Sequence, residues 1–141
     1  MEPPPPGFVP LARTSPVLEL IGPIYSRGTG AELVLGLRAE PKHANARGWV
    51  HGGILATLAD VALGYCLESL AEHRASLVTV SLSLDYAGTA RAGEWIESRV
   101  DVQHLGGRLA FANAYLVSGT TRLVRASGVF LVRERQTKTE R

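Results

Sequence analysis

Cysteine is almost absent from this chain, and so is any arrangement of histidines that suits a metal. A single cysteine, Cys66, occurs among the 141 residues, so an intrachain disulfide is excluded. Cys66 lies in the apolar run VALGYCLESL, where a small buried hydrophobe is a simpler interpretation than a nucleophile. The four histidines include no pair at the helical spacing of metal ligands, so no metal site is expected.

Excess charge and long uninterrupted apolar runs are also missing. The formal net charge is only +2, which is too small to argue for a nucleic-acid partner. The opening MEPPPPGFVP has neither a basic nor an apolar signal region, so no signal peptide is expected. No apolar stretch reaches about 18 residues, so the sequence predicts no membrane span and no membrane partner. These absences lead us to expect a cytoplasmic protein.

The length suits one domain with three segments. Residues 1–29 form a proline-rich extension, in which TSPVLELIG predicts a short helix with a Thr or Ser cap and a glycine stop. Residues 30–133 carry regular patterning and are predicted to be the folded domain. Residues 134–141 are charged, and we expect them to form a solvated, flexible tail.

The longest apolar segment runs from Gly52 to about Leu70. It is too long for a strand and rich in alanine and leucine, so it predicts a helix of about five turns. Apolar residues occupy most faces of this helix. The rest of the protein therefore has to cover it nearly all round.

Alternating segments predict one strand before this helix and four after it. The first is AELVLGLRA, and the four later ones are LVTVSLSLDY, EWIESRVDVQHL, RLAFANAYLVS and TRLVRASGVFLVRE. In the first of the later four, alternation places Val78, Val80, Leu82 and Leu84 on one face. Small residues on the inner faces of the last two strands would let a sheet curl closely around a thick helix. The predicted class is α+β, with a curved antiparallel sheet wrapped around one long central helix.

The candidate chemistry lies in NARGWVHGGILATLAD, residues 45–60. Gly52 and Gly53 stand where the loop enters the helix, and a helix N-terminus exposes unpaired N–H groups and a partial positive charge. Those groups suit a developing oxyanion that approaches the glycines closely, and His51 could donate to the same oxygen. The alternative is that the glycines only make a tight turn and that His51 only packs.

Asp60 is the one carboxylate between Gly52 and Cys66 in the apolar run. No Arg or Lys lies within one helical turn of Asp60, so either a residue from elsewhere pairs with it or it lines a cleft. A desolvated carboxylate suits general-base or nucleophilic work. Gly52 and Asp60 are about 12 Å apart along a helix, too far to act on one carbonyl. A second copy would have to complete the site, which predicts a two-fold dimer.

HANARGWVHGGILATLADVALG resembles the hotdog-fold acyl-CoA thioesterases, specifically the PaaI-like group of the phenylacetate pathway. The resemblance continues through VTVSLSLDYAGTARAGEWIESRVDVQHLGGRLAFANAYLV to RLVRASGVFLV. It implies a hotdog fold and hydrolysis of an acyl- or aryl-acyl-CoA thioester to the free acid and coenzyme A. It implies no cofactor, because coenzyme A is part of the substrate, and a homodimer, with a dimer of dimers as the expected tetramer.

The resemblance also implies residue roles. Asp60 looks like the catalytic acid, either a general base on water or a nucleophile. Gly52 looks like the backbone amide that polarises the thioester carbonyl, while His51 and Asn45 look like residues that orient it. Thr79 falls where relatives hold the attacking water. The family's dimer places Asp60 and Thr79 against the other subunit's Asn45, His51 and Gly52. The alternatives are a solvent-facing Thr79 and an Asn45 that only forms a turn.

Further positions are expected to contact the substrate. Gly53 adjoins the helix start, and the acyl chain is expected along the helix near Leu55, Leu58 and Tyr86. Arg91 in AGTARAGE and Arg108 after the GG turn are the nearest basic candidates for the coenzyme A phosphates. The alternative for each arginine is a solvated surface side chain.

Two other functions remain open from the sequence. One is a non-catalytic acyl-CoA binding module, because a fold does not fix a function. The other is a hotdog enoyl-CoA hydratase or dehydratase, which would pair a histidine with an acid for proton chemistry. His51 and Asp60 instead look assigned to a thioester site.

Overall fold

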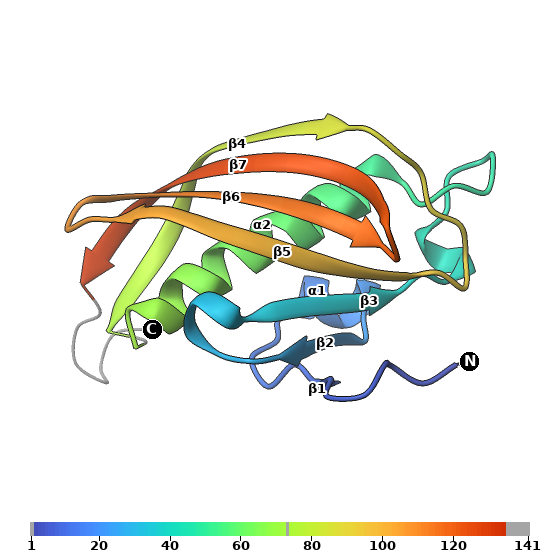
Figure 1. The fold of residues 1–141 in the computed structure, drawn as a ribbon, viewed down its shortest axis with the longest axis horizontal. Helices are drawn as coiled ribbons and strands as arrows, with labels where there is room; N and C mark the ends of the chain where they lie inside the picture. The colour runs from blue at the N-terminus through green and yellow to red at the C-terminus, as the bar shows by residue number, and fades with distance from the viewer. Residues whose placement is uncertain (1, 73, 135–141) are drawn as a thin grey trace.

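A curved antiparallel sheet wraps around one long helix in the computed structural model, which describes residues 2–72 and 74–134 (Figure 1). Most of the tail predicted for residues 134–141 thus lies outside the described residues. The sheet has seven strands in the order β1-β2-β3-β5-β6-β7-β4. The strands are β1 (Val9–Pro10), β2 (Ile24–Arg27), β3 (Val34–Arg38), β4 (Ala75–Tyr86), β5 (Trp95–Leu105), β6 (Leu109–Ser118) and β7 (Thr121–Glu134). The predicted α+β hotdog architecture is confirmed.

The central helix α2 (Gly52–Leu70) has the predicted bounds. One stripe of α2 packs on the sheet and is buried, with Leu55, Leu58, Leu63 and Leu67 at 2% exposure or less. The opposite side is only half-covered, including Asp60. Complete coverage of the helix is therefore not achieved by the single chain. The helix is also long and apolar enough to span a membrane, but its buried stripe belongs to the core of this domain.

Small side chains bring the sheet close to the helix, as the sequence predicts. Ala110, Ala112 and Ala114 of β6 are all buried on the inner face. Gly128 of β7 faces the helix so closely that a Cβ there would lie 3.1 Å from Leu63 Cδ1. Larger residues at these positions would push the helix away from the sheet.

The N-terminal extension contributes more to the fold than the sequence predicts. Its short helix α1 (Pro16–Ile21) is confirmed, with Ser15 Oγ accepting from the Leu18 N–H at 3.3 Å and Gly22 at the C-terminal end. The strands β1 and β2 were not predicted, yet β2 pairs along its whole length with β3. They are too short to show a period of two, so pairing with the rest of the sheet defines them.

One prediction for β4 is wrong, because the strand contains a bulge. The register with β7 shifts between Thr79 and Ser81, which leaves Val80 as the extra residue. Val78 and Val80 are 44% and 60% exposed and do not share the inner face with Leu82 and Leu84. Because a bulge adds one residue to the strand, the alternation of side chains between the two faces changes phase across it. Thr79 consequently faces the helix instead of solvent alone.

Candidate active site

Asp60 and Thr79 meet where the edge strand β4 passes α2. The Thr79 hydroxyl donates to Asp60 Oδ1 at 2.8 Å. Among the described residues, Asp60 forms no ion pair, and its Oδ2 has no protein donor. Asp60 is half-buried in the single chain and Thr79 is exposed, so the pair lies at the surface of the single chain. The hydroxyl and the carboxylate together form a small polar site on an otherwise apolar helix.

A second polar site lies at the start of α2. His51 is the N-cap residue, and its Nδ1 accepts from the Gly53 N–H at 3.0 Å. A neutral imidazole that accepts at Nδ1 carries its proton at Nε2, so Nε2–H remains as a donor. Within the described part of the chain, neither His51 Nε2 nor the Gly52 N–H has a hydrogen-bond acceptor. Two donors on adjacent residues are therefore left at the positive end of the helix, where an oxyanion would be stabilised.

Asn45 shapes the loop that leads into this helix. Its Oδ1 accepts from the Arg47 N–H at 2.9 Å and from the Trp49 N–H at 3.1 Å. The structure thus shows the turn-forming role that was the sequence-based alternative for Asn45. The same two bonds fix the orientation of the side-chain amide, and its NH₂ group forms no hydrogen bond with the described residues. The turn role and a contact with substrate are compatible.

His43 anchors the same loop, although no pattern in the sequence indicates this role. It is 1% exposed, its Nδ1 accepts from the Glu40 N–H at 2.9 Å, and its Nε2 bonds the Ile21 carbonyl at the end of α1. The His43 carbonyl in turn accepts from the His51 N–H at 2.8 Å. The N-terminal extension is therefore tied to the loop that presents His51.

The residues that the sequence predicts as substrate contacts differ in their exposure. Leu55 is 2% exposed and packs in the core of the single chain, and its predicted contact with the acyl chain stays a prediction. Gly53 is exposed, but its N–H is already bonded to His51. Tyr86 ends β4 beside the helix start, where its hydroxyl donates to the Gly52 carbonyl at 2.8 Å.

The two candidate arginines lie at opposite ends of β5. The Arg91 guanidinium stacks on the Trp49 ring, 3.8 Å from its centroid, and has no ion-pair partner among the described residues. Arg108 follows the turn at the far end of β5, an 11-residue strand that spans roughly 35 Å. One chain cannot use both arginines on the same phosphate group.

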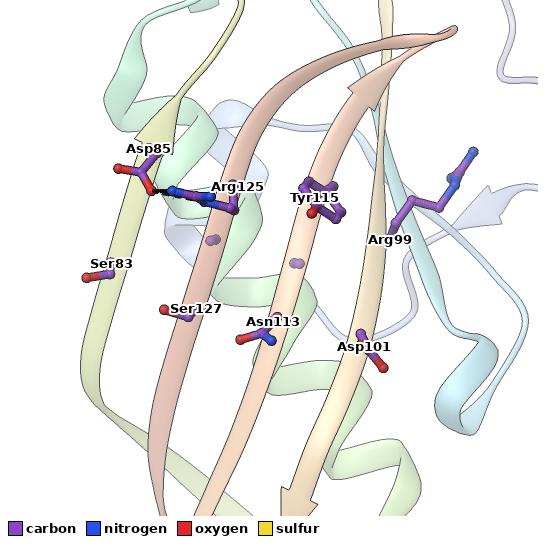
Figure 2. A pocket seen from close by; sticks show the side chains of 10 residues that line it. Ser83, Asp85, Arg99, Asp101, Asn113, Tyr115, Arg125 and Ser127 are labelled. Atoms are coloured by element: carbon purple, nitrogen blue, oxygen red, sulfur yellow. Dashed lines mark hydrogen bonds and ion pairs between the residues drawn. The ribbon is translucent and has the colours of Figure 1, made fainter.

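A concave region lies elsewhere, on the face of the sheet that points away from α2 (Figure 2). It has a volume of about 270 Å³ and includes the Asp85–Arg125 ion pair at 2.7 Å. None of the residues predicted for the active site lines this hollow. No group of three metal-ligating side chains occurs within the described residues.

A single long helix wrapped by a curved antiparallel sheet is the fold of the hotdog thioesterases. The chain belongs to this class, because the thioesterase superfamily model matches residues 47–125. An inferred esterase of Pseudomonas aeruginosa is 49% identical over 127 residues, covering 89% of this chain and 95% of that protein. Acyl-coenzyme A thioesterase 13 of Mus musculus is 33% identical over 97 residues, which is 69% of each chain.

The solved structures agree with this assignment. A variant of the phenylacetic acid degradation protein PaaI from Thermus thermophilus superposes with a TM-score of 0.72 and 25% identity. The match covers 83% of this chain and 98% of that one. The family resemblance predicted from the sequence is thereby confirmed.

Proposed function

We propose that the protein hydrolyses an acyl- or aryl-acyl-CoA thioester to the free acid and coenzyme A, without a cofactor. The observation that carries this proposal is the Asp60–Thr79 pair, together with the two free donors of His51 and Gly52. The pair suits activation of water or direct attack, and the donors suit the oxyanion. The similarity to acyl-coenzyme A thioesterase 13 supports coenzyme A as the thiol.

The proposed reaction begins when the thioester oxygen accepts hydrogen bonds from the Gly52 N–H and from His51 Nε2–H. Asp60 then takes a proton from a water held beside Thr79, and the resulting hydroxide adds to the carbonyl carbon. The C–S bond breaks, coenzyme A leaves as a thiolate, and the proton on Asp60 passes to it. The alternative is attack by Asp60 itself, which forms an anhydride that water then hydrolyses.

The two halves of the site are proposed to come from two subunits. Asp60 lies about 12 Å along α2 from Gly52, so the partner subunit's Gly52 must face Asp60. The half-covered side of α2 and the exposed Val80 on the edge strand β4 support this dimer, because an unpaired edge strand invites pairing.

We further propose that two dimers associate through the outer faces of their sheets. Leu109, Phe111 and Leu131 are 41%, 39% and 41% exposed there, on the adjacent strands β6 and β7. Neighbouring exposed apolar side chains favour association with a second copy. Light scattering of the purified protein tests both levels of assembly.

Of the two arginines, Arg91 is proposed to hold a coenzyme A phosphate. It is on the surface between β4 and β5, it pairs with Trp49 of the loop that leads to His51, and it has no ion-pair partner among the described residues. Replacement of Arg91 by glutamine is expected to raise KM for acyl-CoA more than it lowers kcat. Arg108 lies at the far end of β5, so it would have to contact a different phosphate from the one that Arg91 holds.

The test is release of coenzyme A thiol from a panel of short, long and aromatic acyl-CoAs. We expect turnover of at least one thioester and its loss in Asp60→Asn, with Asp101→Asn on the outer face as a matched control. Tight acyl-CoA binding without turnover would instead support a binding module. Hydration of an enoyl-CoA without thiol release would support a hydratase.

A further inference from the structure

We infer that Tyr86 is a positioning residue that sets the tautomer of His51 through the peptide group between Gly52 and Gly53. This inference rests on the proposed function, because it assigns His51 Nε2–H to the thioester oxygen. Tyr86 does not have to touch the substrate in this role. Its hydroxyl acts on the backbone of the oxyanion site.

Tyr86 is placed on the helix start by the end of β4. After the bulge, Leu82 and Leu84 face the core, and Tyr86 continues this alternation toward the first turn of α2. Its hydroxyl donates to the Gly52 carbonyl at 2.8 Å. The ring covers Gly52 so closely that a Cβ there would lie 3.3 Å from Tyr86 Cζ. Glycine at position 52 therefore allows the tyrosine to reach the backbone.

The other side of the same peptide group faces His51. The Gly53 N–H donates to His51 Nδ1 at 3.0 Å. Hydrogen bonds in a chain polarise one another, so donation by Tyr86 to the carbonyl makes the Gly53 N–H a stronger donor. A strong donor facing Nδ1 keeps that nitrogen unprotonated, and the imidazole proton then lies on Nε2.

The tautomer decides whether His51 can take part in catalysis. With the proton on Nε2, the ring donates to the developing oxyanion. With the proton on Nδ1, two N–H groups would oppose each other at Gly53, and a lone pair on Nε2 would repel the oxyanion. The line of contacts from Tyr86 to His51 thus excludes the unproductive tautomer.

The experiment compares Tyr86→Phe with a matched control, Tyr115→Phe. Tyr115 lies on β6, and Arg122 stacks on its ring at 4.0 Å, away from α2. The ring-nitrogen shifts of His51 are recorded by 15N NMR near pH 9, where histidine is ordinarily neutral. His51→Gln identifies the signal among the four histidines.

We expect the wild-type protein and Tyr115→Phe to show the Nε2–H tautomer and Tyr86→Phe to show a mixture. Loss of one hydrogen bond predicts a fall in kcat of roughly 2- to 10-fold, with KM unchanged. An unchanged tautomer in Tyr86→Phe, or a change confined to KM, would overturn the inference. So would a wild-type protein that holds the Nδ1–H form. The NMR readout needs no substrate, so its outcome is separable from failure to hydrolyse any thioester.

Discussion

Replacement of Thr79 by valine removes the hydroxyl that donates to Asp60 at 2.8 Å, while the branched shape of the side chain is kept. A hydrogen bond to a charged group contributes about 1.5–3 kcal/mol. If the hydroxyl holds both Asp60 and the attacking water, this energy is lost from the transition state. The expected fall in kcat is then roughly 10- to 150-fold. Because Thr79 is exposed, the free energy of unfolding should change by less than about 0.5 kcal/mol.

The assay is steady-state thiol release with the best substrate of the panel, and urea unfolding measures stability alongside. Thr79→Ser keeps the hydroxyl and should retain most of the activity. Ser83→Ala changes a hydroxyl of the same strand on the outer face and should have no effect. Wild-type kcat in Thr79→Val would refute the reasoning, as would equal losses in Thr79→Ser and Thr79→Val.

Three other predictions concern the loop, the sheet and the buried thiol. Asn45→Asp keeps the oxygen that closes the turn, so the Tm should hold while kcat/KM falls roughly tenfold or more; an unchanged kcat/KM contradicts the carbonyl-orienting role. Gly36→Ala places a Cβ in overlap with the Trp95 ring and should lower the free energy of unfolding by about 1–3 kcal/mol, whereas the Cβ of Gly107→Ala meets nothing within 4 Å. Equal effects of the two substitutions in urea unfolding would contradict the packing argument. Burial, followed by the nearby Glu32 charge, raises the pKa of Cys66 from 9.0 to about 11. The folded state favours the neutral thiol, so stability should decrease as pH rises from 9.0 to about 11, and Cys66→Ala should flatten this slope in pH-dependent unfolding.

The long helix and the later strands were predictable from the sequence because their patterns are local. The bulge in β4 was not, since LVTVSLSLDY alternates without interruption and the extra residue is defined only by pairing with β7. This shift in register brings the Thr79 hydroxyl within hydrogen-bonding distance of Asp60. The strand β2 was missed for the same reason, because four residues show no period of their own and depend on β3.

Candidate site residues could be picked out from the sequence where a residue type was unusual for its position. Asp60 was conspicuous as an acid in an apolar helix, and Gly52 as a glycine at a helix start. Tyr86 and His43 showed no such signal for the hydrogen bonds that they form, because each bonds a backbone carbonyl distant in sequence. For Leu55, apolar character alone does not distinguish a core residue from one that lines a substrate groove.

The most direct test of the account is complementation between two inactive variants. Asp60→Asn and His51→Ala each disable a different half of the proposed site, so each should show little thiol release alone. When the two chains are co-expressed in equal amounts, about half of the dimers are mixed and each has one intact site, so about a quarter of the wild-type activity should return. Formation of mixed dimers, verified by mass spectrometry, without any recovery of thiol release would contradict a site shared between subunits.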